Sequence, residues 1–199
     1  MTQAPIVALR KFVRPRESEE RCDACGVSLS ADHIHQFDPT TRRIRCACHS
    51  CAALNATSYR DIPRRVMHLP NFQITDAQWD DLMIPISLAF FSFQTPANRV
   101  VALYPGPAGA TESSLRLEAW EEIANANPEL KGMEPDVEAL LVNRVGQARD
   151  YFIVPIDECY KLVGLIRLHW HGLSGGALVW GEIGRFFENL RGRAGACQI

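Results

Sequence analysis

The chain has 199 residues, a net charge of −2, 47% hydrophobic and 22% charged residues, which is the composition of a folded protein that buries a core. Its longest apolar stretch, residues 84–93, is interrupted by Pro85 and is much shorter than the roughly 20 residues that span a bilayer, so a membrane-spanning protein is excluded. The charge is divided unevenly, because residues 1–66 carry eleven basic and seven acidic residues, whereas residues 67–199 carry ten and sixteen.

Residues 1–20 are predicted to form a flexible N-terminus, because they are charged and lack hydrophobic periodicity. They do not read as a secretory signal, since residues 1–11 have neither a leading positive charge nor a continuous apolar segment. We therefore expect a cytoplasmic protein. In that reducing compartment, paired cysteines bind metals more often than they form disulfides.

Five of the seven cysteines lie within a span of thirty residues, which indicates a Cys-rich module at residues 21–66. Four of them form two Cys-x2-Cys pairs with 22 residues between the pairs: Cys22 with Cys25, and Cys48 with Cys51. Thiolates spaced in this way on a tight turn can face one cation, and two such turns supply the four ligands of a tetrahedral site. Because four protein ligands leave no open coordination position, we expect a structural role for the metal.

Two short strands are predicted between the cysteine pairs, at residues 33–38 and 42–46. Good helix formers then begin at Ser50, within the second pair. A cysteine turn, a hairpin and a second pair at a helix start are typical of a treble-clef-like zinc module. Residues 60–65 are expected to be a linker to the rest of the chain.

Further candidate ligands lie in the same module. Cys46 shares a strand face with Cys48, so it can replace Cys48, remain a free thiol beside the site, or contribute to a polynuclear centre. His33 and His35 share one strand face and, with His49, are candidates for a second site or a secondary ligand set. Polar positions on an exposed hairpin are the alternative interpretation of these histidines.

Zn²⁺ is the ion that we favour for the four cysteines. A single iron of the rubredoxin type or an iron–sulfur cluster takes the same ligands and is the alternative. The second pair, within residues 48–52, lacks the Pro and Gly with which rubredoxin turns direct backbone amides at the sulfurs. This composition disfavours iron.

The remaining sequence, residues 67–192, predicts an α+β domain in which an antiparallel sheet of two hairpins packs with helices. The expected elements are a helix from an N-cap at Thr75 to Leu82, strands at 86–93 and 99–104, a helix at 117–126, and strands at 137–145 and 151–154. The strand at residues 86–93 is apolar on both faces, so it should be central in the sheet. Residues 104–111 are rich in Gly and Pro and are expected to form a loop.

Two amphipathic helices are predicted after the last strand, separated by residues 172–176. Asp157 is expected to cap the first of them. Residues 193–199 are expected to form a C-terminal tail in which Cys197 has no role.

Six arginines surround the Cys-rich module: Arg42, Arg43, Arg45, Arg60, Arg64 and Arg65. Such a surface suits phosphate, but Tyr59 is the one nearby aromatic residue for stacking on bases, so nucleic-acid binding is the weaker interpretation. Docking onto an acidic protein surface, including the acidic part of the same chain, is the alternative. No constellation of catalytic side chains is recognisable, so we expect a non-catalytic protein rather than an enzyme.

Four sequence motifs stand out along the chain: Cys-x2-Cys-Gly at 22–26, His-x-His at 33–35, Cys-Ala-Cys-x2-Cys-Ala at 46–52 and Tyr-Pro-Gly-Pro-Ala-Gly-Ala-Thr-Glu-Ser at 104–113. With these motifs the sequence resembles an uncharacterised bacterial family whose genes often lie beside those of high-affinity uptake nickel–iron hydrogenases. The resemblance implies a metal-binding accessory protein that docks onto a hydrogenase subunit or maturation factor. A rubredoxin-like electron carrier for the hydrogenase is the alternative, and a nucleic-acid-binding zinc protein is a weaker one.

Overall fold

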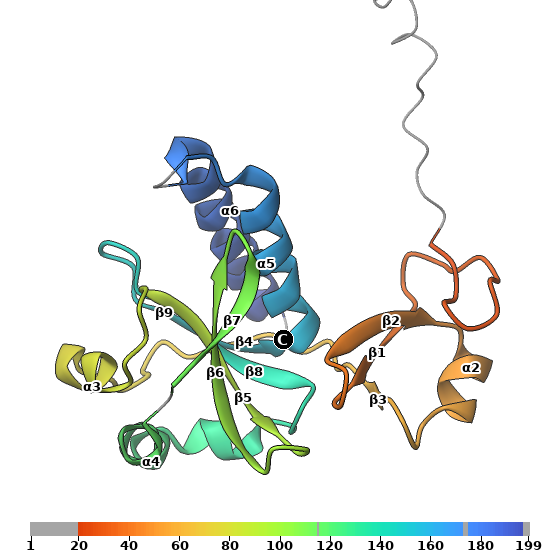
Figure 1. Ribbon diagram of the computed structural model, residues 1–199, viewed down its shortest axis with the longest axis horizontal. Coiled ribbons are helices and arrows are strands. Elements are labelled where there is room, and N and C mark those ends of the chain that lie inside the picture. Colours follow the sequence, from red (N-terminus) through yellow and green to blue (C-terminus); the bar gives the residue numbers. More distant parts are fainter. Residues whose placement is uncertain (1–19, 115, 173–174, 197–199) are drawn as a thin grey trace, which may run out of the picture.

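The computed structural model describes residues 20–114, 116–172 and 175–196, and it confirms an α+β protein with antiparallel sheets and helices (Figure 1). The predicted flexible N-terminus, apart from Glu20, lies outside the described residues, as does Cys197.

The Cys-rich module is built on a three-stranded antiparallel sheet in the order β2-β1-β3. The strands β1 (Ile34–Asp38) and β2 (Arg43–Ala47) form the predicted hairpin, and α2 (His49–Leu54) follows as expected. The predicted linker is wrong at its start, because it begins with a strand, β3 (Arg60–Asp61), that pairs with β1.

A six-stranded antiparallel sheet forms the centre of the rest of the chain, in the order β4-β9-β8-β5-β6-β7. Its strands are β4 (Met67–His68), β5 (Leu88–Gln94), β6 (Arg99–Gly106), β7 (Gly109–Ser113), β8 (Glu138–Asn143) and β9 (Asp150–Pro155). The strand β5 lies between β6 and β8, which confirms the central position predicted from its two apolar faces.

Helices cover both faces of the six-stranded sheet (Figure 1). On one face lie α5 (Ile156–His169) and α6 (Gly176–Ala196), and on the other α3 (Asp76–Asp81), α4 (Leu117–Ala126) and the 3-10 helix η2 (Pro128–Gly132). Because successive side chains of a strand point to opposite faces, Phe90 belongs to the core under α5 and α6, whereas Phe91 packs with Trp79 and Trp120 in the other core.

Three predictions for this part of the chain are wrong. Residues 104–111 are not a loop, because β6 continues to Gly106 and β7 begins at Gly109, whose φ of 130° suits a tight turn. Asp157 does not cap α5, since the N-cap is Pro155 and no side chain caps this helix. The helix α6 runs to Ala196, so residues 193–196 are helical and not part of a tail.

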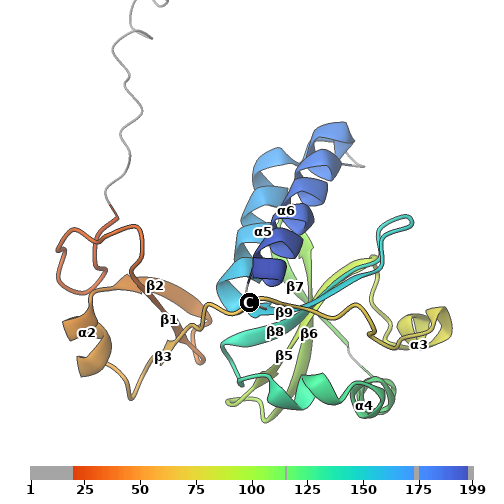
Figure 2. The same cartoon turned by 180° about the vertical axis from the view of Figure 1, so that it is seen from behind.

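The Cys-rich module lies beside the N-terminal end of α5, and extended chain leads from it to β4 (Figure 2). Phe37, Ile62 and Val66 of the module are buried in the same core as α5 and the six-stranded sheet. The Phe37 ring centroid lies 6.5 Å from that of Tyr160 on α5. The module therefore shares apolar packing with the rest of the protein.

Ion pairs join the basic module to the acidic part of the chain. Three arginines of the module pair with carboxylates beyond it: Arg42 with Glu112 at 3.1 Å, Arg60 with Asp136 at 3.2 Å, and Arg65 with Glu138 at 2.5 Å. Asp136 and Glu138 are almost fully buried, so the pairs with Arg60 and Arg65 lie at an internal interface. The basic module thus contacts the acidic part of the same chain, which was one of the alternatives considered for its arginines.

Candidate metal centre

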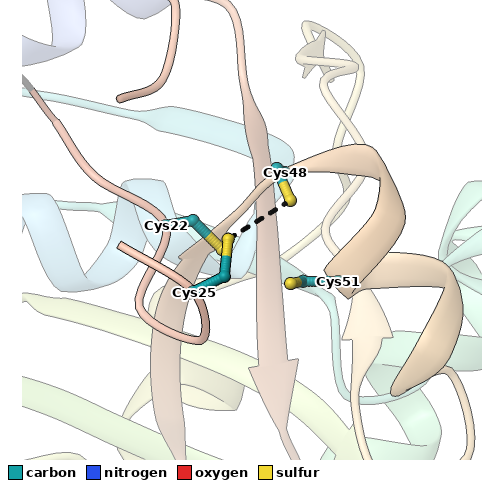
Figure 3. A group of neighbouring side chains, drawn as sticks. All are labelled: Cys22, Cys25, Cys48 and Cys51. Atoms are coloured by element: carbon teal, nitrogen blue, oxygen red, sulfur yellow. Dashed lines mark hydrogen bonds between the residues drawn. The ribbon is translucent and has the colours of Figure 1, made fainter. Parts of the chain in front are cut away.

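A tight turn positions the first cysteine pair. The Gly26 N–H donates to the Cys22 carbonyl at 2.8 Å, and the Cys22 N–H donates to the Val27 carbonyl at 2.9 Å. Gly26 has a φ of 75°, the left-handed conformation that glycine adopts without steric cost. The turn brings the side chains of Cys22 and Cys25 to the same side of the chain (Figure 3).

The start of α2 positions the second pair. Cys48 is the N-cap residue, with extended backbone angles, and Cys51 lies in the first turn. The Ala52 N–H donates to the Cys48 carbonyl at 2.9 Å, and the Asn55 side chain donates to the Cys51 carbonyl at 2.8 Å. These bonds fix the turn from which the second pair projects toward the first.

The four sulfurs converge on one point between the two turns (Figure 3). All four Sγ atoms lie within 4.8 Å of one another, and those of Cys25 and Cys48 are 3.8 Å apart. In a tetrahedral site with metal–sulfur bonds of about 2.3 Å, neighbouring sulfurs lie about 3.8 Å apart. The donor set and its spacing therefore fit a metal ion held by four thiolates.

Two thiols in this cluster have pKa values displaced in opposite directions. Hydrogen bonds from backbone N–H groups, first that of Cys48, lower the pKa of Cys22 to about 6. Hydrogen bonding to the side chains of Cys48 and Cys25, together with burial, raises the pKa of Cys51 to about 12. Cys51 therefore keeps its proton more firmly than Cys22 does, and a cation bound by the Cys51 sulfur would replace that proton.

Cys46 lies apart from the four-cysteine cluster. Its backbone N–H donates to the Asp23 carboxylate at 2.6 Å, and its carbonyl accepts from the Asp23 N–H at 2.9 Å. These two bonds tie the first cysteine turn to β2. The Cys46 sulfur belongs instead to a second group, in which one ligand atom each from His33, His35 and Cys46 lie within 4.8 Å of one another.

A polar hollow of about 220 Å³ lies next to this second group, between the Cys-rich module and the ends of α5 and α6. Asp157, Glu158 and Lys161 of α5 and Arg193 of α6 line it together with both histidines. These four residues were not predicted from the sequence to be part of a site. They are more than 100 residues from the histidines along the chain, and no local motif marks them.

The arginines expected to form a phosphate-binding surface are largely engaged elsewhere. Besides the three that pair across the internal interface, Arg64 pairs with Asp32. The Arg45 guanidinium lies 3.5 Å from the centre of the Tyr59 ring and also donates to Gln36. These contacts weaken the nucleic-acid interpretation.

The fold and the sulfur cluster define an α+β protein with a candidate metal-binding module. The chain belongs to a family of unknown function, DUF5947, whose model matches residues 21–194. This agrees with the expectation that the chain belongs to an uncharacterised family. Comparisons with curated proteins and with solved structures gave no match. Among the helices in the described residues, none is both long enough and apolar enough to cross a bilayer.

Proposed function

We propose that this protein is a non-catalytic accessory protein whose Cys-rich module is held by a structural Zn²⁺ bound to Cys22, Cys25, Cys48 and Cys51. The observation that supports the proposal is the convergence of four Sγ atoms within 4.8 Å from two separate turns. Four thiolates fill a tetrahedral shell, so the ion would hold the two turns together and leave no position for a substrate.

The small size of the module supports a structural role for the ion. Its largest buried apolar side chains, such as Phe37 and Ile62, face the core of the α+β part rather than a core of the module itself. The two cysteine turns project away from that shared core, and Cys25 is exposed. Structural zinc in zinc-finger peptides contributes about 10–16 kcal/mol of apparent binding free energy, which is enough to order such turns.

Metal content and colour test the proposal. We expect protein purified under reducing conditions to be colourless and to hold zinc at the four cysteines, and Cys51→Ser to lose that ion. Visible absorption from a ferric centre or a cluster would instead support the rubredoxin-like electron carrier. Full zinc occupancy in Cys51→Ser would show that the ligand assignment is wrong.

The partner that the resemblance implies is a subunit of an uptake nickel–iron hydrogenase or one of its maturation factors. Exposed apolar side chains on the module suit protein docking, since Leu54 is 82% and Val27 is 51% exposed. Co-purification of the tagged chain with the hydrogenase subunits, compared between the wild type and Leu54→Glu, tests this proposal. Equal recovery from the two would argue against docking through Leu54. Tight, salt-sensitive binding to RNA or DNA would favour the nucleic-acid alternative.

A further inference from the structure

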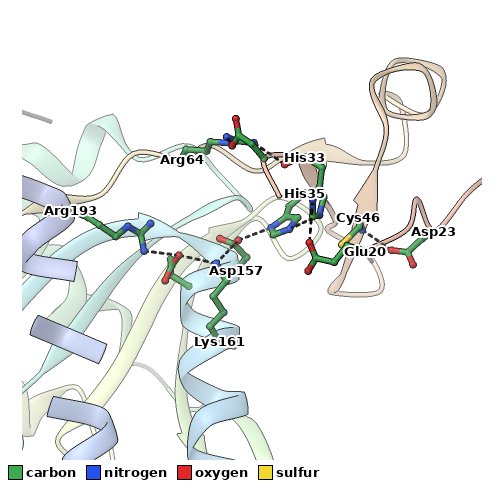
Figure 4. A network of polar contacts seen from close by, with 11 residues as sticks. Glu20, Asp23, His33, His35, Cys46, Arg64, Asp157, Lys161 and Arg193 are labelled. Carbon is green, nitrogen blue, oxygen red and sulfur yellow. Dashed lines mark hydrogen bonds and ion pairs between the residues drawn. The ribbon is translucent and has the colours of Figure 1, made fainter. Parts of the chain in front are cut away.

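His33, His35 and Cys46 form a compact group on the side of the module that faces α5 (Figure 4). His35 and Cys46 are direct neighbours across the β1–β2 hairpin. The Nε2 atoms of the two imidazoles lie 3.1 Å apart. Strand pairing thus places His35 beside Cys46, and His33, which directly precedes β1, adds the second imidazole.

The hydrogen bonds made by the Nδ1 atoms of the two histidines leave the lone pairs of their Nε2 atoms facing each other. His33 Nδ1 lies 2.8 Å from the Ser30 carbonyl oxygen, and His35 Nδ1 lies 2.9 Å from Asp157 Oδ2. Both oxygens accept hydrogen bonds, so both Nδ1 atoms carry a proton, and in a neutral ring this leaves Nε2 as an acceptor. Two acceptors at hydrogen-bond distance repel each other unless a cation lies between them.

This arrangement is typical of metal-binding histidines. A metal-bound imidazole usually donates its other N–H to a carboxylate or a backbone carbonyl, which fixes the ring and its tautomer. His35 has a carboxylate partner and His33 has a carbonyl partner. With metal–nitrogen bonds of about 2.0–2.1 Å, two nitrogens of a tetrahedral site lie about 3.3 Å apart, close to the observed separation.

The neighbouring hollow leaves room for a fourth ligand. It borders both imidazoles and has a volume of about 220 Å³, enough for several water molecules or a small anion. Within the described part of the chain, the buried Oδ1 atom of Asp157 has no hydrogen-bond partner. A water bound to an ion in this hollow would supply the missing donor. Lys161 and Arg193 also line the hollow, where they form ion pairs with Asp157 and Glu158.

We propose that His33, His35 and Cys46 form a second site, distinct from the four-cysteine centre, that binds one divalent transition-metal ion of the Zn²⁺ type through two nitrogens and one sulfur. Three protein ligands leave one coordination position open toward the polar hollow. This is the ligand count of metal sites that accept an exchangeable ligand, whereas the four-cysteine centre has a closed shell. The proposal goes beyond the accessory function above and does not depend on the ion that the four cysteines hold.

Cobalt titration of the full chain tests the second site. Protein stripped of metal under reducing conditions and titrated with Co²⁺ is expected to bind two ions per chain. The ion at the second site should add about a quarter of the sulfur-to-cobalt charge-transfer absorption of the first, since it has one thiolate instead of four. Zinc titration with elemental analysis should give the same stoichiometry.

Single substitutions separate the two sites. His33→Gln, His35→Gln and Cys46→Ser are each expected to reduce the capacity from two ions to one while the four-thiolate spectrum remains, which also shows that the module is folded. His49→Gln is the matched control, because His49 is an exposed imidazole at the start of α2, and it should still bind two ions. Asp157→Asn, which weakens the support of His35, should lower the affinity of the second ion by about 10- to 100-fold.

Three outcomes would overturn the proposal. A capacity of one ion in the saturated wild type would mean that a proton alone lies between the imidazoles. Two ions in both histidine variants would mean that the second ion binds elsewhere. Loss of the four-thiolate spectrum in Cys46→Ser would make Cys46 a ligand of the first centre. Absence of a four-thiolate spectrum in the wild type would instead contradict the proposed function. The second site would still be judged by the number of ions bound to the wild type and to the histidine variants.

Discussion

Replacement of Arg65 by Met is expected to destabilise the protein by about 3 kcal/mol, because it leaves the Glu138 carboxylate buried without its cation. Glu138 is fully buried, and Arg65 donates to its two oxygens at 2.5 and 2.6 Å and to the Gly132 carbonyl at 2.6 Å. Breaking a buried ion pair costs about 3–5 kcal/mol. The Arg65 side chain is 41% exposed, so water screens the pair and the lower end of this range applies.

Urea and thermal unfolding measure this loss. In a chain of this size, 1 kcal/mol corresponds to about 2–4 °C in Tm, so Arg65→Met should melt about 6–12 °C below the wild type. Arg43→Met, at an exposed position on β2, is the matched control and should change stability by no more than about 0.5 kcal/mol. The double variant Arg65→Met/Glu138→Gln should recover part of the loss, because an amide is less costly to bury than an unpaired carboxylate. Equal stability of Arg65→Met and Arg43→Met would refute the reasoning.

Three further predictions concern pH, a helix cap and the metal. Burial raises the pKa of Glu112, but hydrogen bonds from Arg42 and Arg99 lower it, and the net shift is a decrease. The ionised carboxylate therefore stabilises the fold at pH values above its unfolded pKa of about 4.3. This stabilisation is lost as the pH falls through the lower pKa of the folded state. The difference in unfolding free energy between the wild type and Glu112→Gln should therefore shrink from about pH 7 to about pH 3, and a constant difference would contradict this assignment. Thr75→Ala should cost about 1 kcal/mol in urea unfolding, because the Thr75 hydroxyl accepts from the Gln78 N–H at 3.1 Å in a capping box, and an unchanged midpoint would argue against that cap. Chelation of the metal should speed amide exchange in the Cys-rich module while the central strands of the large sheet stay protected, and equal exchange with and without chelator would contradict a structural ion.

Local patterns predicted the parts of the fold that depend on neighbouring residues. The spacing of Cys22 with Cys25 and of Cys48 with Cys51 predicted two turns that face one point, and the sulfurs do converge. The Thr75 cap and the helix at residues 117–126 also follow the sequence pattern. Each cysteine turn and the Thr75 cap depend on contacts within a few residues, and the short β1–β2 hairpin then brings the two turns together.

The missed features depend on contacts between distant segments or on ambiguous local composition. His35 meets Asp157 from 122 residues away, so no local pattern distinguishes this carboxylate from an ordinary helix cap. Residues 104–111 have the composition of a loop, yet pairing with the preceding strand makes the second half of the segment a strand. The strand β3 is two residues long and exists because β1 offers an edge.

The module and α5, which contact each other in the folded protein, are synthesised at different times. Translation proceeds at about 5–20 residues per second, so Asp157 leaves the ribosome roughly 6–24 s after His35, to which it is hydrogen-bonded across 122 residues. During that interval the four cysteines of the module have been synthesised, whereas α5, against which the module packs, has not. Under the proposed function, metal binding by the newly made module can therefore precede its packing against α5. In a cell short of that metal, the module would meet α5 without a fixed shape.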